Sequence, residues 1–255
     1  MPAEKPLLYI ILGASGSGRR EVLADVIEDG LAGDATARSH VLLAEAEAGS
    51  DVDGRLGTRS TWRTVDDAID AEVPVGATHV FFVTDGRANP IDQLECLKPW
   101  LESRGLELAR VVCVVNCGLA ERHPQLQAWY DACIHFSDVV LLNRREGVSN
   151  KWLSDFRGRY ESQFYPCLFE MVKGARVKNP ALLLEPQARR ISHLFDEDVE
   201  WVVEMEDEDA DTDDEGAVEA HPEVDPYIER RAGGRRVREL PDIATFLDRE
   251  ATGAA

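Results

Sequence analysis

A short loop near the N-terminus combines glycine and serine at a regular spacing. It runs Gly13-Ala14-Ser15-Gly16-Ser17-Gly18 and is followed by Arg19 and Arg20. The G-x-x-x-x-G spacing is that of a P-loop, where glycines let backbone N–H groups approach phosphate oxygens closely. The alternative is a turn that only joins a strand to a helix. The predicted phosphate-binding residues are Gly13, Ser15, Gly16, Ser17, Gly18, Arg19 and Arg20.

The two residues after this loop differ from those of an ordinary P-loop, which are Lys and then Ser or Thr. Arg19 and Arg20 occupy these positions. The guanidinium of Arg19 can pair with β- and γ-phosphate oxygens, although its forked head is bulkier than an ammonium. Arg20 cannot supply the hydroxyl that ligates Mg²⁺. The sequence therefore predicts a phosphate loop with a doubtful magnesium site.

Two further polar groups follow apolar runs. Asp85, within Thr84-Asp85-Gly86-Arg87-Ala88-Asn89-Pro90, comes where a metal ligand or water-orienting group near the γ-phosphate would lie. A turn before a helix explains the same composition.

Asn143-Arg144-Arg145-Glu146 is similar to the N-K-x-D motif of guanine-binding GTPases. In this motif Asn143 would contact the guanine ring, Arg144 would stack on it, and Glu146 would stand in for the Asp as a longer carboxylate. The alternative for this motif is a polar loop.

The elements that must position these residues alternate along the chain. A continuous apolar run at 7–12 precedes the glycine loop, and apolar residues at helical spacing follow it over 21–31. Continuous apolar strands between amphipathic helices predict an α/β, P-loop NTPase-like three-layer sandwich with a mostly parallel sheet. Further strands are expected at 39–44, 78–84, 109–116, 138–143 and 167–172, and helices at 65–71, 92–103, 124–134 and 149–163.

Taken in this order at strand ends, the three motifs resemble the CobW-like P-loop GTPases, relatives of the HypB and UreG metallochaperones. The resemblance covers about residues 7–172. Thr84 to Pro90 is similar to the family segment E-T-S-G-L-A-D-P, with Val83 at the place of its Glu. Residues 111–116 resemble V-V-x-V-V-D, with Asn116 in place of Asp. Residues 132–143 resemble Q-I-A-F-A-D-x-I-x-L-N-K, and Phe164-Tyr165-Pro166 lies where the family has L-N-P.

The resemblance implies a protein that binds GTP or GDP and has a regulatory or chaperone-type role. Several family features are missing, namely the loop lysine, the magnesium-binding hydroxyl and the C-x-C-C metal motif, since residues 45–77 contain no cysteine. Ala44-Glu45-Ala46-Glu47 is the nearest match to the N-E-F-G switch. Weak or absent GTP hydrolysis is therefore expected. The alternative is a pseudo-GTPase scaffold that binds a protein partner and no nucleotide.

Charge divides the chain into three parts. The net charge is −20, yet residues 196–225 hold 16 acidic and no basic residues, and the remainder has 32 acidic and 28 basic residues. We expect a nucleotide-binding domain at 1–195, an acidic linker disordered by self-repulsion at 196–225, and a basic, amphipathic tail at 226–255. The acidic and basic parts are candidates for contact with each other or with a protein partner.

Several classes of protein and site are disfavoured. The strong negative charge argues against nucleic-acid binding, and no apolar run reaches the roughly 20 residues that a membrane span needs. The five cysteines lie mostly in apolar runs without a C-x-x-C pair, which indicates small buried residues in a reducing compartment. The six histidines form no ligand pair, so no metal site is expected. The sequence predicts a cytoplasmic protein.

Overall fold

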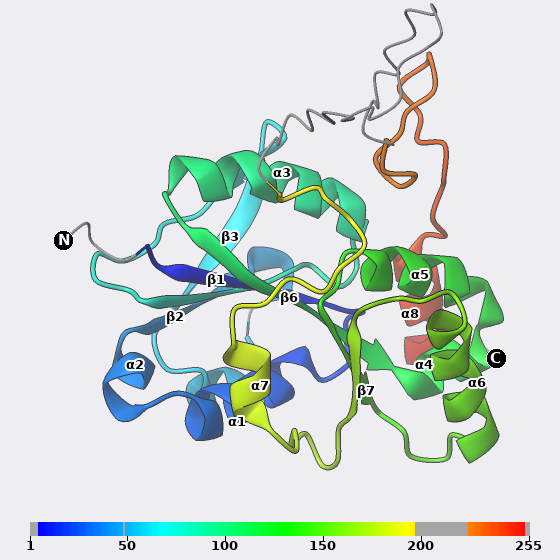
Figure 1. Cartoon of the computed structure of the whole chain (residues 1–255), viewed down its shortest axis with the longest axis horizontal. Coiled ribbons are helices and arrows are strands. Elements are labelled where there is room, and N and C mark those ends of the chain that lie inside the picture. Colours follow the sequence, from blue (N-terminus) through cyan, green and yellow to red (C-terminus); the bar gives the residue numbers. More distant parts are fainter. Residues whose placement is uncertain (1–4, 48, 197–223, 253–255) are drawn as a thin grey trace, which may run out of the picture.

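The computed structural model describes residues 5–47, 49–196 and 224–252. Its centre is an eight-stranded sheet in the order β4-β3-β2-β5-β1-β6-β7-β8, parallel except for the β3–β4 pair (Figure 1). The predicted α/β fold with a mostly parallel sheet is thereby confirmed. The strands are β1 Leu7–Leu12, β2 Ser39–Ala44, β3 Arg59–Val65, β4 Ala68–Asp70, β5 His79–Val83, β6 Glu107–Asn116, β7 Val139–Asn143 and β8 Leu168–Met171.

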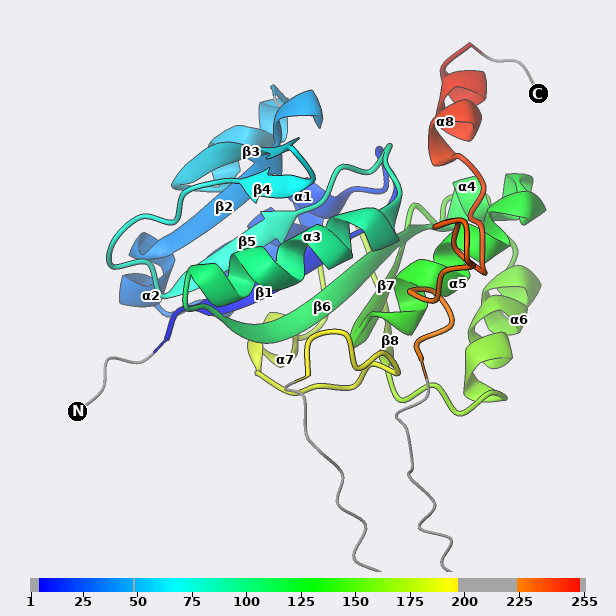
Figure 2. The same ribbon diagram turned by 90° about the horizontal axis from the view of Figure 1, so that it is seen from above.

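Helices cover both faces of this sheet (Figures 1 and 2). One face carries α1 and α7, and the other carries α3 and α5, with α4, α6 and α8 beyond them. None of the helices in the described part of the chain has the length and apolar character to cross a bilayer. The helices are α1 Arg19–Gly30, α2 Gly33–Ala37, α3 Pro90–Ser103, α4 Cys117–Arg122, α5 Gln127–His135, α6 Asn150–Glu161, α7 Pro180–Leu184 and α8 Ile243–Thr252, with short 3₁₀ turns η1 Glu45–Glu47, η2 Asp51–Arg55 and η3 Pro124–Leu126.

Alternation along each strand creates one apolar core on each face of the sheet. On β1, Ile10 packs into the core beneath α3 and α5, and Tyr9 packs into the core beneath α1 and α7. Both residues are at most 1% exposed, which explains why the strands are apolar without interruption. The five cysteines are all free thiols, and four of them are buried.

The helix predicted at 65–71 is wrong, because this stretch is the turn and second strand of a hairpin. β3 pairs antiparallel with β4, and Asp66 and Asp67 join them with φ angles of 48° and 59°. Positive φ at both central residues is the geometry of a tight hairpin turn, which Asp tolerates better than most residues. β3 and β4 lie at the sheet edge with mostly exposed residues, so they lack the long apolar run that identifies the other strands.

The C-terminal tail returns to the domain. Tyr227 and Ile243, 5% and 2% exposed, belong to the same apolar core as α5. Arg236 pairs with Asp92 and Glu95 on α3. Arg230 also pairs with Glu95, so two arginines of the basic tail face acids of α3. The predicted disorder of the acidic segment falls on residues 197–223, outside the described residues.

Candidate functional site

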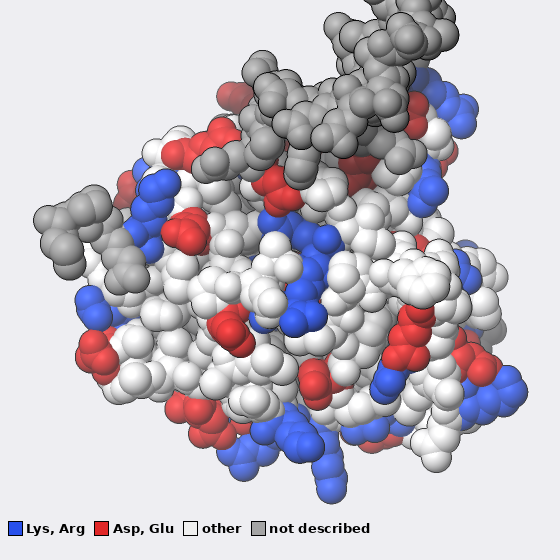
Figure 3. All heavy atoms as spheres, in the orientation of Figure 1, with Lys and Arg blue, Asp and Glu red and all other residues white. Residues whose placement is uncertain are grey.

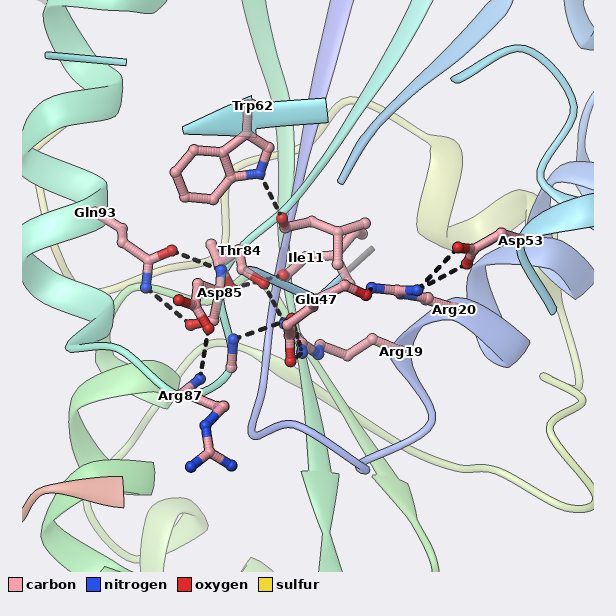
Figure 4. A network of polar contacts seen from close by, with 12 residues as sticks. Ile11, Arg19, Arg20, Glu47, Asp53, Trp62, Thr84, Asp85, Arg87 and Gln93 are labelled. Carbon is pink, nitrogen blue, oxygen red and sulfur yellow. Dashed lines mark hydrogen bonds and ion pairs between the residues drawn. The ribbon is translucent and has the colours of Figure 1, made fainter. Parts of the chain in front are cut away.

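The glycine loop lies at the carboxyl end of β1 and leads into α1, as the motif predicts (Figure 4). Gly13 has φ +141°, and a Cβ there would come within 2.4 Å of the Val114 carbonyl oxygen of β6. Glycine at this position therefore lets the loop pass directly over the sheet edge. Gly18, the N-cap of α1, has φ +87°.

Arg19, at the position of the P-loop lysine, is almost fully buried and binds two groups of the protein. Its Nη1 donates to the Thr84 carbonyl at the end of β5, and its Nη2 lies 2.9 and 2.7 Å from the two carboxylate oxygens of Glu47 in η1. The side chains of Arg19 and Glu47 are only 5% and 8% exposed. The charge that would face a phosphate is thus balanced inside the protein.

Glu47 is held by more than Arg19. The Gly86 N–H donates to its Oε2 at 3.3 Å, and the Ser15 hydroxyl also hydrogen-bonds the carboxylate. Burial alone raises the pKa of Glu47, but Arg19, Ser15 and the Gly86 N–H together hold that pKa below its ordinary value. Glu47 is therefore a carboxylate anion surrounded by a guanidinium, a hydroxyl and a backbone amide. Figure 4 shows its carboxylate facing Arg19.

The loop also packs tightly against the segment after β5. The Ser15 N–H donates to the Gly86 carbonyl at 3.0 Å, and the Ser17 N–H donates to the Ala14 carbonyl at 3.0 Å. A Cβ on Gly86 would lie 2.3 Å from the Ser15 nitrogen. The Ser17 hydroxyl is fully buried and has no hydrogen-bond partner within the described ranges. Two of the loop amides thus bond to protein carbonyls.

Arg20 binds the segment between β2 and β3. Its Nη1 lies 2.8 and 3.1 Å from the carboxylate oxygens of Asp53, and its Nη2 donates to the Glu47 carbonyl. Asp53 also accepts the Gly49 and Ser50 N–H groups at 3.3 and 3.0 Å. Arg20 therefore anchors η1 and η2 at the place where a P-loop hydroxyl would contact magnesium.

Asp85 lies beside this loop at the end of β5, but its contacts are those of a turn. Its Oδ1 accepts the Arg87 N–H at 2.9 Å, and its own N–H donates to the Gln93 Oε1 at 2.7 Å. The side chain is partly exposed. The structure thus brings Asp85 near Arg19 while engaging it in the local turn that its sequence context also explains.

The Asn143 motif approaches the loop from β7. Asn143 is buried, and its Nδ2 donates to the Ser17 carbonyl at 2.8 Å. Arg144 adopts φ 49° and pairs with Glu21 of α1 at 2.8 Å. Glu146 is exposed in the same loop. Asn143 therefore fixes the glycine loop, while Arg144 and Glu146 are exposed.

Glu47 and Asp53 are the site residues that motif analysis missed. The sequence marks Glu47 only as the end of a switch-like stretch, and no motif includes Asp53. Both lie in a segment whose composition has no phosphate-binding or metal-binding pattern. The sequence offers one signal, namely four acids in the 45–55 segment and two arginines at the positions of a Lys and a hydroxyl residue.

No family model and no curated protein matches the chain. Similar solved structures include Zn(II)-bound YjiA GTPase from E. coli, which is 13% identical, with 73% of this chain and 67% of that chain covered and a TM-score of 0.39. A Zn(II)-bound triple mutant of YjiA GTPase is 12% identical, with the same coverage and a TM-score of 0.41. Another is the cell division protein FtsY from Thermotoga maritima, which is 13% identical, with 77% of this chain and 70% of that chain covered and a TM-score of 0.43. The fold assignment rests on the strand order and loop of this chain.

The residues of the site fit a phosphate group better than a magnesium ion. Arg19, Ser15 and the Gly86 N–H already hold a carboxylate, so they are donors suited to an anionic oxygen. The position that supplies a hydroxyl to magnesium holds the guanidinium of Arg20, a cation that offers no oxygen. A phosphate is therefore compatible with this donor set, and Arg20 itself offers no oxygen ligand for a loop-bound Mg²⁺.

Proposed function

We propose that this chain is a CobW-like P-loop protein that binds a guanine nucleotide and hydrolyses it weakly or not at all, in a regulatory or chaperone-type role. One observation carries the proposal. Arg19, Ser15 and the Gly86 N–H converge on a single anionic group in a loop of P-loop spacing. Such a set of donors stabilises phosphate in the same way.

The base would lie against the Asn143 motif. Asn143 is already fixed to the Ser17 carbonyl, while Arg144 and Glu146 are exposed, so that a ring can be stacked and its N–H groups accepted. Gly13, Gly16, Gly18 and Ser17 would follow the phosphates along the loop. Asp85 would lie on the γ-phosphate side, with no metal between it and Arg20.

Weak hydrolysis follows from the residues next to the phosphate. In ordinary P-loop enzymes, a loop hydroxyl and an acidic residue hold the magnesium that bridges the β- and γ-phosphates. Here the hydroxyl is replaced by Arg20, and the Asp85 carboxylate accepts a backbone N–H. Two guanidiniums can neutralise phosphate charge, but they do not orient an attacking water.

Isothermal titration calorimetry with GTP, GDP and ATP, each in Mg²⁺ and in EDTA, tests this proposal. Guanine nucleotides are expected to bind with an affinity that changes little when EDTA replaces Mg²⁺. Phosphate release, followed over hours, is expected to be far slower than in an ordinary GTPase. Tight Mg²⁺-dependent binding with rapid phosphate release would contradict the proposal.

A second candidate is a pseudo-GTPase scaffold that binds a protein and no nucleotide. It is favoured by one feature, the pairing of both loop arginines with carboxylates of the same chain. Its signature in the same calorimetry is an absence of heat with every nucleotide at millimolar concentration. In thermal unfolding, the scaffold would show no shift, whereas a ligand that binds only the folded state raises Tm.

A further inference from the structure

The geometry points to a competitor built into the phosphate site. We infer that the Glu47 carboxylate occupies the place of a terminal phosphate, and that a phosphate-bearing ligand must displace it and thereby release η1. We call the contacts of Glu47 with Arg19, Ser15 and Gly86 the Glu47 latch. The inference rests on the proposed function and adds a regulation to that site.

The first step is the match between the two anions. A carboxylate and a phosphate both present charged oxygens that a guanidinium fork can bind in pairs. In the latch, the two oxygens of Glu47 lie 2.9 and 2.7 Å from the Arg19 Nη2, and the Gly86 N–H reaches one of them at 3.3 Å. These donors are the ones a terminal phosphate would need.

The second step is exclusion. Glu47 and Arg19 are more than nine-tenths buried, so little water screens the charges at this point. A phosphate placed against the same Arg19 nitrogen would bring two anions into contact in a poorly screened site. That arrangement is strongly unfavourable, so one anion must leave. Glu47 lies in a three-residue turn that Arg20 holds through one backbone carbonyl, whereas Asn143 fixes the glycine loop, so we expect Glu47 to be the anion that leaves.

The third step is the response of the surrounding chain. Arg20 donates to the Glu47 carbonyl but also holds Asp53, and Arg55 of η2 pairs with Glu28 of α1 at 2.6 Å. Displacement of Glu47 removes the first contact and leaves the other two. The movement is therefore expected in η1, while η2 stays anchored on α1.

The ligand class follows from the charges around the latch. Arg19 and Arg20 supply two fixed positive charges, and Arg20 stands where a metal-binding hydroxyl would lie. The ligand that competes best is then a polyanionic phosphate chain without bound metal. Inorganic triphosphate in EDTA is the simplest probe, because it has no base and reports on the latch alone.

The test compares Glu47→Gln with the wild-type chain by calorimetry with inorganic triphosphate in EDTA. Gln keeps the shape of Glu47 and removes its charge, so the affinity should rise about tenfold or more, a size common for close buried charge pairs. The matched control is Glu45→Gln, which removes the same charge from an exposed side chain in the same turn. Its affinity should stay within about twofold of wild type.

A second measurement uses the wild-type chain, so the test does not depend on the stability of the variant. Hydrogen exchange with saturating triphosphate should become faster in the peptide that covers η1 and stay unchanged in residues 53–56. Equal affinities of E47Q and wild type, a complete lack of triphosphate binding by E47Q, or slower exchange in η1 would each overturn the latch.

The outcomes also separate the latch from the proposed function. If E47Q binds triphosphate tightly but GTP no better than triphosphate, the latch stands and guanine recognition fails. If wild type and E47Q bind GTP equally well, nucleotide binding stands and the latch fails. Each result therefore decides one of the two without depending on the other.

Discussion

At the scale of single residues, the presence of Arg19 where an ordinary P-loop has lysine has a clear structural reason. A guanidinium has donors pointing in different directions, and Arg19 uses them to bind the Thr84 carbonyl and the Glu47 carboxylate at once. A lysine ammonium is a single point charge and would hold both groups less well. The same argument applies to Arg20, which binds Asp53 and the Glu47 carbonyl together.

The double substitution Arg19→Lys with Arg20→Thr tests the identity of these two positions. It restores the residues of an ordinary P-loop, so nucleotide binding should become dependent on Mg²⁺. Turnover should remain low, because Val83 and Asn116 still differ from the CobW-like pattern that the sequence resembles. Calorimetry in Mg²⁺ and in EDTA, followed by a phosphate-release assay, measures both effects. Unchanged binding in EDTA would contradict the role given to Arg20.

Gly86 provides a second test at this scale. An added Cβ would lie 2.3 Å from the Ser15 nitrogen and 2.7 Å from the Ala14 carbonyl carbon, so Gly86→Ala must push the loop away. We expect a loss of about 1–3 kcal/mol in the free energy of unfolding, as for other overpacked sites. Chemical denaturation measures this loss.

Gly158→Ala is the control for that experiment. Gly158 lies inside α6 with open space around its Cβ position. The same substitution should there stabilise the chain by about 0.5–1 kcal/mol, because alanine is the better helix former. A similar effect of both substitutions would show that the close approach of Gly86 to the loop is not what limits stability.

At the scale of elements, the sequence predicted most of the sheet because its central strands are buried on both faces. Residues 39–44 match β2 to the residue, and the apolar runs before Asp85 and Asn143 match β5 and β7 within a residue or two. The hairpin of β3 and β4 was missed since an exposed edge strand needs no apolar run. Its turn depends on positive φ at Asp66 and Asp67, which sequence does not display.

The candidate site was predictable only in part. The loop, Asp85 and Asn143 follow local motifs, and the structure brings all three to one edge of the sheet. The partners of the loop were not predictable because they depend on tertiary approach. Glu47 and Asp53 reach the arginines across 28 and 33 residues of chain. Nothing local in η1 or η2 marks them as partners of α1.

The tail is docked by a contact between buried His135 and partly buried Asp225. The His135 Nε2 lies 2.9 Å from the Asp225 Oδ2. Burial alone raises the pKa of Asp225, but contacts from His135, Ser192 and the Tyr227 N–H hold that pKa below its ordinary value. A carboxyl with a depressed pKa stabilises the folded state above its unfolded pKa of about 3.9, and this contribution is lost as the pH falls further.

Asp225→Asn should therefore destabilise the chain by about 1–3 kcal/mol near pH 7, as expected for a lost charge-assisted hydrogen bond. The difference from wild type should shrink as the pH falls below about 4, because Asp225 then becomes protonated. Urea unfolding from pH 3 to pH 7 gives both curves. The exposed Glu229→Gln is the control and should follow the wild-type curve. A difference that is constant over this range would argue against the pair.

At the scale of the whole molecule, the described surface is of mixed charge. On the face shown in Figure 3, acidic and basic side chains are interspersed among the described residues. This agrees with the near balance of charges outside residues 196–225. The excess negative charge of the chain is therefore concentrated in one segment, and its field acts mainly within a Debye length of about 8 Å at physiological salt.

The composition of this segment predicts cleavage by a protease between Glu200 and His221, residues that lie outside the described ranges. After cleavage, the two fragments should remain together, because Tyr227 and Ile243 are buried in the domain core and Arg230 pairs with Glu95 at 2.7 Å. Size-exclusion chromatography of the nicked protein, with mass spectrometry of the eluted peak, measures the association. Separate elution of the C-terminal fragment would contradict the docking of the tail.

His135 contacts the chain near both ends of the acidic segment. Its carbonyl accepts the Ser192 N–H at 3.3 Å shortly before the segment, and its ring binds Asp225, the last residue of the segment. The chain thus departs from and returns to one point on the domain, so the length between these anchors places no constraint on the fold. Residues can therefore be added or removed between these anchors at little cost in the free energy of folding. For protein engineering, the same point is a natural place to insert a reporter domain or an affinity tag.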